Sequence, residues 1–281
     1  MQETKAIAEI RKAVKAWKQE GKTIGLVPTM GFLHEGHASL IKKCREDNDV
    51  VVVSDFVNPV QFGPAEDLEA YPRDFGRDSA LCESLGVDMI FHPEPAEMYN
   101  DPHITVQVDT LNETLCGVTR PVHFGGVCTV VAKRFNIVSP DRAYVGEKDA
   151  QQLAIVKKMV IDLNFDITIV GCPIVREADG LARSSRNTYL NPEERQAALC
   201  LSRAVKKGQA VIGAGVEGET VLAPMRQEIE AEPLATIDYV QMVDALTMQP
   251  VARADGPVLV AMAVVVGKTR LIDNFSWSQD R

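Results

Sequence analysis

Two histidines at the start of a predicted helix are the residues of this chain best suited by type and spacing to do chemistry. His34 and His37 lie three positions apart, after an apolar run at 24–27 that predicts a buried strand. Side chains with this spacing project from the same side of a first helical turn. Free backbone N–H groups and the helix dipole favour an anion there, and imidazoles donate hydrogen bonds to phosphate oxygens. The stretch therefore predicts a phosphate-binding turn between a strand and a helix.

Two other interpretations of the pair remain open on spacing alone. The histidines could be ordinary surface residues, or they could form half of a zinc site. The other three histidines, His92, His103 and His123, are scattered along the chain, so a third zinc ligand is hard to place.

A second strand–turn–helix pattern runs from a strand at 142–145 into Gly146-Glu147-Lys148-Asp149. Lys148 is either a solvated surface charge or a second anion contact at the same edge of the sheet. Asp149 fits a capping box with Gln152, three positions on. Glu147 and Asp149 could equally hold Mg²⁺ through water, as Mg²⁺ commonly meets nucleotides.

A third polar group lies further along the chain, at Ser184-Ser185-Arg186. Two hydroxyls and a bidentate guanidinium can grip a triphosphate. The alternative is a polar linker to the helix that starts at Asn191-Pro192. Gln61 follows the second predicted strand, but neither it nor Gln152 indicates a function alone.

The order of predicted elements indicates an α/β fold. Strand 24–27, a helix to about residue 48 and strand 49–57 form a βαβ unit with parallel strands. The pattern continues with a helix at 66–85, in which Tyr71-Pro72-Arg73 either lies inside the helix or divides a loop from it. A strand at 87–91, an irregular stretch at 92–125, a helix after 126 and strands at 142–145 and 166–170 follow. We expect a parallel sheet with helices on both faces over 1–174. A smaller α+β domain follows over 175–281, with helices at 192–211 and 217–231 and strands at 236–243, 257–266 and 269–273.

Composition excludes several classes of protein. The 281 residues carry a net charge of -9, which makes a broad nucleic-acid surface unexpected. Six cysteines form no C-x-x-C pair and suggest reduced thiols in a cytoplasmic protein. The first residues form an amphipathic helix and no signal peptide, and the longest apolar run, at 258–266, is too short to span a bilayer. No P-loop or G-x-S-x-G motif is present.

Several motifs together carry a resemblance to a known family. The string Pro28-Thr-Met-Gly-Phe-Leu-His-Glu-Gly-His37 resembles the HxGH signature of the nucleotidylyl-transferase superfamily and, within it, the pantoate–β-alanine ligases. The segments 145–152 and 176–187 resemble two further signatures of that family, and 56–62 and 123–131 also look like family segments. The matches run in order from about 24 to 191.

The resemblance implies a Rossmann-like fold and an ATP-dependent ligase. ATP and pantoate would give pantoyl adenylate and pyrophosphate, and β-alanine would then attack to give pantothenate and AMP. Mg²⁺ would accompany ATP, and the family implies a homodimer. The sequence itself shows no interface motif.

The resemblance also implies roles for individual residues. His34, His37, Lys148 and Arg186 would be catalytic, with His37 the proton donor and Lys148 bridging the phosphates. Gln61 and Gln152 would hold pantoate, Gln61 would also face β-alanine, and Val175 would touch adenine. The full set implied to bind ATP is Met30, Gly31, Phe32, Leu33, His34, Glu35, Gly36, His37, Gly146, Glu147, Lys148, Asp149, Val175, Arg183, Ser184, Ser185 and Arg186.

Two positions differ from the expected family pattern, and three alternative functions remain open. Arg183 stands where an apolar residue is expected, and Val122 stands where glycine is expected. The alternatives are another HxGH nucleotidylyl-transferase, a non-catalytic nucleotide sensor on the same fold, and a metal-dependent hydrolase that uses His34 and His37.

Overall fold

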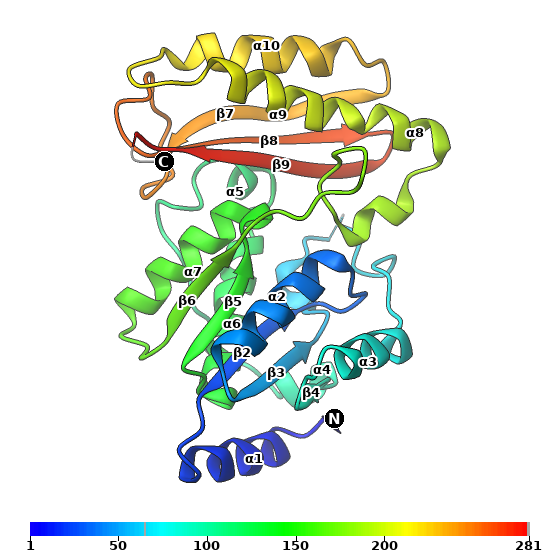
Figure 1. The fold of residues 1–281 in the computed structure, drawn as a ribbon, viewed down its shortest axis with the longest axis vertical. Coiled ribbons are helices and arrows are strands. Elements are labelled where there is room, and N and C mark those ends of the chain that lie inside the picture. The colour runs from blue at the N-terminus through cyan, green and yellow to red at the C-terminus, as the bar shows by residue number, and fades with distance from the viewer. Residues whose placement is uncertain (65, 280–281) are drawn as a thin grey trace. The chain divides into compact units, whose positions relative to one another are not determined.

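A computed structural model describes residues 1–64 and 66–279 of the chain (Figure 1). The described residues divide into two compact units. The first contains residues 1–64, 66–108, 120–147 and 155–173, and the second contains 109–119, 148–154 and 174–279. The predicted domains, 1–174 and 175–281, differ from these units mainly in the segments 109–119 and 148–154, which pack with the C-terminal part of the chain.

The first unit is built on a parallel sheet of six strands. Its strand order is β1-β4-β3-β2-β5-β6, and every pair is parallel. The strands are β1 (Gln2–Thr4), β2 (Ile24–Thr29), β3 (Val50–Asp55), β4 (Met89–Phe91), β5 (Arg142–Gly146) and β6 (Thr168–Cys172). The α/β prediction is confirmed, although sequence patterning missed β1, whose three residues are too few to show a period.

Helices and short turns connect these strands and cover the sheet. The connecting elements are α1 (Ile7–Gln19), α2 (Glu35–Asp47), η1 (Pro59–Gln61), α3 (Phe75–Ser84), α4 (Pro95–Met98), α6 (His123–Val138), η2 (Glu147–Asp149) and α7 (Ala150–Asp162), the last two shared with the second unit. Leu40, Ile41 and Cys44 of α2 pack on Val27 and Val51 of the sheet. Of the predicted helix at 66–85, only 75–84 is helical and Asp74 caps its start, so Tyr71-Pro72-Arg73 belongs to a loop before the helix, which was the second of the two alternatives.

The strand order places a topological switch point between β2 and β5. The chain runs from β2 outward to β3 and β4, and then returns to β5 on the other side of β2. Connections on either side of such a point cross opposite faces of the sheet and leave a crevice at the carboxyl ends of the two strands. The histidine turn follows β2 and Glu147 follows β5, so both lie at this edge.

The second unit is an antiparallel sheet covered by two long helices. β7 (Ala235–Asp244), β8 (Val258–Val266) and β9 (Thr269–Trp277) pair in that order. The apolar side chains of α9 (Leu199–Val211) and α10 (Gly218–Glu230) form a core with alternate residues of β8, among them Val260 and Met262. The remaining elements are α5 (Cys116–Thr119), η3 (Ser185–Tyr189) and α8 (Pro192–Ala197).

Candidate active site

The two histidines cap the first turn of α2 with their own rings. The Gly36 N–H donates to His34 Nδ1 at 3.1 Å, and the His34 N–H donates to His37 Nδ1 at 3.3 Å. The ring centroids are 4.1 Å apart. An Nδ1 that accepts a hydrogen bond carries no proton, so each neutral ring holds its proton on Nε2. Both imidazoles are thereby fixed as Nε2–H donors at a helix N-terminus, the arrangement that suits a phosphate.

A buried carboxylate fixes the backbone before these histidines. Asp78 of α3 accepts the N–H groups of Phe32 and Leu33, each at 2.6 Å. Gly31 and Phe32 have positive φ angles of 78° and 50°, a conformation that costs energy for phenylalanine. A Cβ added to Gly31 would lie 2.4 Å from an Asp55 oxygen. The sequence does not predict the hydrogen bonds from Phe32 and Leu33 to Asp78, because it places Asp78 only within a predicted helix.

Asp55 and Asp78 form an acidic pair beneath the turn. Burial, followed by the negative charge of Asp78, raises the pKa of Asp55 to about 6, while His92 and Arg134 oppose the shift. Burial also raises the pKa of Asp78, against the two backbone N–H groups that favour its ionised form. His92 lies within reach of the pair, with its Nδ1 2.9 Å from the Asp55 carbonyl oxygen. The two carboxyls are therefore costly to ionise together.

Gln61 is buried and held at several points. Its carboxamide accepts from Asn58 Nδ2 at 3.0 Å and donates towards Met30 Sδ at 3.0 Å. His123 Nδ1 lies 3.1 Å from the backbone carbonyl oxygen of Gln61. Gly126 of α6 allows this close approach, because a Cβ there would lie 2.4 Å from the carbonyl oxygen of Val60. The first unit thus brings Gln61 and Met30 into direct contact.

Arg134 of α6 binds backbone carbonyls at the ends of the two central strands, β2 and β3. Its Nη2 donates to the carbonyls of Thr29 at 2.9 Å and Phe56 at 3.1 Å, where β2 and β3 end. The side chain is buried, and burial lowers the pKa of Arg134 to about 10. The sequence gave no reason to select this arginine, because it lies within the apolar pattern of α6.

Gly146 and Glu147 end the part of the first unit that contains β5, and the second unit carries the other predicted site residues in two segments. Lys148 and Asp149 follow β5 and begin the first segment, with Lys148 Nζ 3.8 Å from an Asp149 oxygen. Gln152 lies one turn on, in α7. The Asp149 side chain is 49% exposed, so its carboxylate faces water.

The second segment, 175–186, folds back on itself as a small hairpin. The Arg183 N–H donates to the Val175 carbonyl at 2.9 Å, and Arg176 bridges to Ala182. The Ser184 hydroxyl accepts the Arg186 N–H at 3.3 Å and caps η3. Val175, Arg183 and the Ser-Ser-Arg group are therefore parts of one local structure.

Comparison with known proteins decides the family. The sequence profile described as pantoate-beta-alanine ligase matches residues 2–276 of the chain. The chain belongs to this family. It is 60% identical to the pantothenate synthetase of Ruminiclostridium cellulolyticum, with all of both chains covered. It is 57% identical to a Clostridium botulinum pantothenate synthetase, with 96% of this chain and 97% of that one covered.

Solved structures of ligases from this family have the same fold. The pantothenate synthetase of Thermus thermophilus is 44% identical, with a TM-score of 0.93 over 98% of this chain and 99% of that one. The pantoate-beta-alanine ligase of Francisella tularensis is 32% identical, with a TM-score of 0.82 over 100% of this chain and 98% of that one. That structure is described as a complex with beta-gamma ATP and beta-alanine. The fold class and the function as a pantothenate-forming ligase are therefore confirmed.

The positive charge of Arg183, where the resemblance leads us to expect an apolar residue, is balanced by a neighbouring carboxylate. Arg183 lies 3.0 Å from Glu177, which also accepts from Arg195 at 2.7 Å and Asn187 at 2.8 Å. Burial alone would raise the pKa of Glu177, but these donors hold it below its usual value. Val122, the other position that differs from the expected family pattern, precedes the first residue of α6 and is half-exposed.

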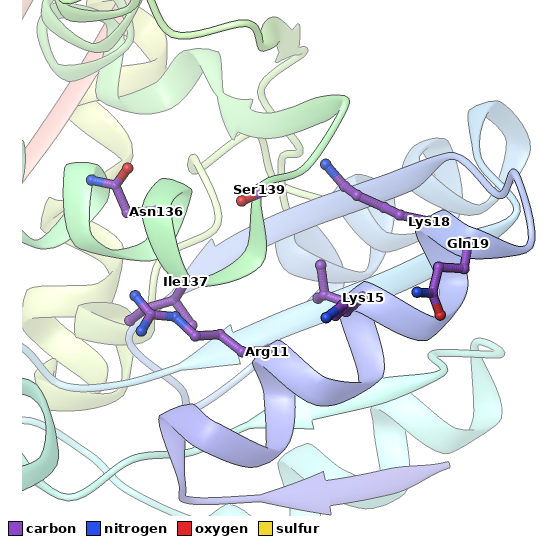
Figure 2. A pocket seen from close by; sticks show the side chains of 8 residues that line it. Arg11, Lys15, Lys18, Gln19, Asn136, Ile137 and Ser139 are labelled. Carbon is purple, nitrogen blue, oxygen red and sulfur yellow. The ribbon is translucent and has the colours of Figure 1, made fainter.

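Two cavities of the first unit differ in their relation to the predicted ligase site. One, of about 400 Å³, is lined by Met30, Gly31 and Phe32 of the histidine turn and by both Asp55 and Asp78. The other, of about 480 Å³, lies between α1 and α6 and is lined by Arg11, Lys15 and Lys18 (Figure 2). No predicted site residue lines the second cavity, and its three cations are exposed to water.

The described residues were compared with the requirements of a metal site and of a membrane-spanning helix. Among residues 1–64 and 66–279, no three His, Cys, Asp or Glu side chains are grouped so that they could hold a metal ion. No helix in the same ranges combines the length and the apolar character needed to cross a membrane.

Proposed function

We propose that this ligase condenses (R)-pantoate with β-alanine through a pantoyl-adenylate intermediate, releasing AMP and pyrophosphate. The observation that carries the proposal is the histidine turn, with two Nε2–H donors fixed at a helix N-terminus beside the switch point of the sheet. The Francisella tularensis relative, whose structure is a complex with beta-gamma ATP and beta-alanine, supports ATP and β-alanine as substrates here.

The first step is attack of the pantoate carboxylate on the α-phosphorus of ATP. This carboxylate is ionised at neutral pH, so no general base is required. The barrier lies in repulsion between anions and in charge that builds on pyrophosphate, so catalysis depends on positioning and positive charge. We assign this work to His34, His37, Lys148 and Arg186, with His37 Nε2–H as proton donor to the phosphate oxygens and Lys148 bridging them.

ATP binding is assigned to segments in each unit. In the first unit, Met30–His37, Gly146 and Glu147 would line the nucleotide at the carboxyl ends of β2 and β5. In the second, Lys148, Asp149, Val175 and Arg183–Arg186 would contact it, with Val175 against adenine. The hairpin at 175–186 supports the second set, because it joins the adenine contact to the triphosphate contacts in one structure.

Pantoate is assigned to two amides, Gln61 and Gln152. The contacts of Gln61 with Asn58 and Met30 support this role, because a pre-oriented amide loses little freedom when it binds a hydroxyl or carboxylate. β-Alanine, which Gln61 would also face, attacks the acyl carbon of the adenylate. Its nitrogen forms the amide bond, the C–O bond to AMP breaks, and the amine releases its protons.

Mg²⁺ is proposed to accompany ATP. Such an ion commonly needs only one or two carboxylates beside phosphates and water, and the exposed carboxylate of Asp149 fits this requirement. When bound, the ion would supply positive charge to the phosphate oxygens.

Assembly, location and domain roles are further parts of the proposal. We place the enzyme in the cytoplasm as a homodimer, with residues 175–281 as a lid domain. The six cysteines, all buried and unpaired, support a reducing compartment.

The proposal is tested by a coupled assay for AMP with purified protein, ATP, Mg²⁺, (R)-pantoate and β-alanine, each omitted in turn. AMP should form only when both cosubstrates are present. A folded protein that binds ATP without producing AMP would instead support the nucleotide sensor, and AMP formation with another acceptor would support a different HxGH transferase.

A further inference from the structure

Two adjacent residues of β9 bind the two segments of the second unit to which we assign ATP contacts. Asp273 and Asn274 lie opposite Met262 and Ala261 of β8. Side chains alternate across a strand, so the two point to opposite faces of the sheet. Asp273 lies on the face that carries Leu271 and Phe275 into the helix-covered core, and Asn274 lies on the other.

Asp273 forms a paired, buried contact with Arg176. Its carboxylate accepts from Arg176 Nη1 at 2.7 Å and from Nη2 at 2.9 Å, and its side chain is 0% exposed. A carboxylate between apolar residues is costly to bury, and a bidentate guanidinium offsets that cost only in a well-defined geometry. The ion pair therefore holds the Arg176 guanidinium in one position relative to β9.

Arg176 in turn fixes the hairpin at 175–186. Its Nη1 also donates to the Gly180 carbonyl at 3.1 Å, at the tip of the hairpin. The returning strand is held by the Arg183 N–H on the Val175 carbonyl. The position of Asp273 therefore determines the position of the hairpin, and with it the position of the segment Ser184–Arg186 that follows.

Asn274 holds the other segment. Its Nδ2 donates to the backbone carbonyl of Lys148 at 2.9 Å, and the Asn274 N–H donates to Asp273 Oδ1 at 2.8 Å. Gln151 joins the same segment to residues 111–116, because it donates to the carbonyls of Leu111 and Thr114 and accepts the Cys116 N–H. The backbone of Lys148 is thus fixed by a side chain of β9.

We propose that Asp273 and Asn274 are positioning residues of the adenylation step, which set the spacing between Lys148 and the Arg183–Arg186 loop. The inference rests on the proposed function, because it requires both segments to contact ATP. Each residue acts through the segment that it binds, Asp273 through Arg176 and Asn274 through the backbone of Lys148. Charge on the triphosphate is stabilised only when the lysine and the arginine meet it together, and a displacement of about 1 Å can cost about 100-fold in rate.

The test is the Asn274→Asp variant, which keeps the size of the side chain but replaces the N–H donor with an oxygen that repels the Lys148 carbonyl. The assay is pantoate-dependent exchange of labelled pyrophosphate into ATP, which reports adenylation without β-alanine. We expect kcat for exchange to fall by about 10- to 100-fold, with the KM for pantoate and the melting temperature close to wild type. The matched control is Ser276→Ala, an exposed position of the same strand.

A second variant keeps the inference testable if Asn274→Asp does not fold. Asp273→Asn retains one acceptor for Arg176 and should lower kcat for exchange in the same direction, again with little change in the KM for pantoate. Wild-type kcat in a folded variant, or a loss explained entirely by a lower melting temperature, would overturn the inference. Absence of exchange in the wild-type protein would overturn the proposed function itself.

Discussion

Asp78 and Phe32, 46 positions apart in sequence, are joined by a hydrogen bond of 2.6 Å from the Phe32 N–H to the buried carboxylate. The second carboxylate oxygen accepts the Leu33 N–H. These two bonds offset the strain of the positive φ angle at Phe32. The helix that follows β3 therefore determines the path of the chain into the histidine turn.

The first prediction concerns Asp78. Asp78→Asn should lose one of the two backbone bonds, and a hydrogen bond to a charged group is usually worth about 1.5–3 kcal/mol. The free energy of unfolding should fall by less than this, because the substitution also removes a buried charge beside Asp55. Because the turn loosens, kcat/KM for ATP should also fall. Urea unfolding and the AMP assay measure the two effects, with the exposed Asp109→Asn as control. A variant with wild-type stability and kcat/KM would show that the contact is dispensable.

The second prediction concerns the pH dependence of stability at Asp55. The folded-state pKa of this carboxyl is raised from 3.8 to about 6, so the folded protein binds more protons than the unfolded chain between these values. The contribution of Asp55 to the free energy of unfolding is therefore highest below pH 3.8 and falls as the pH rises to about 6. Asp55→Asn should unfold at a higher urea concentration than wild type at neutral pH, and the difference should shrink below pH 3.8. A difference that is independent of pH would contradict the assignment.

The third prediction separates the capping and chemical roles of His37. His37→Asn retains an oxygen that can accept the His34 N–H, whereas His37→Ala does not, so the alanine variant should be less stable by about 1 kcal/mol. Both variants lose the Nε2–H donor, and both should lose most of the AMP-forming activity. Thermal unfolding and the AMP assay report the two roles. An active asparagine variant would mean that His37 acts only as a cap.

The fourth prediction concerns Gly126 and Gln61, whose side chain we propose binds pantoate. In Gly126→Ala the new Cβ would lie 2.4 Å from the Val60 carbonyl oxygen and 2.5 Å from Gln61 Cα, so the turn that carries Gln61 must move. The KM for pantoate should rise about tenfold while the KM for ATP changes little. The adjacent Gly125→Ala is the control, because its Cβ meets the movable end of the Gln107 side chain. Equal effects of the two substitutions on the KM for pantoate would contradict this account.

Sequence patterning predicted the local parts of the structure well. The strand–turn–helix at 24–47 was recognised because its apolar strand, its glycines and its histidines are all neighbours in the chain. Capping by the histidine rings was not foreseen, since histidine is an unusual cap and its ring acts here through Nδ1. The predicted roles of the site residues stay proposals.

Contacts between distant segments were beyond the sequence. Asp78, Arg134 and Asn274 each hold a backbone group far away in the chain, and a single polar residue within a helix or strand carries no mark of its partner. The segments 109–119 and 148–154 were assigned to the first domain by the order of elements. Gln151 joins the two segments to each other, and Arg270 of β9 donates to the Thr119 hydroxyl at 3.2 Å, but patterning does not distinguish these side chains from surface residues.

The central claim is that pantoate is activated as its adenylate, and oxygen transfer tests it most directly. Pantoate labelled with heavy oxygen in its carboxylate is incubated with the enzyme, ATP, Mg²⁺ and β-alanine, and the products are analysed by mass spectrometry. If the carboxylate attacks the α-phosphorus, one labelled oxygen remains on the AMP phosphoryl group when the C–O bond breaks. Unlabelled AMP, or label found in pyrophosphate or inorganic phosphate, would contradict the account.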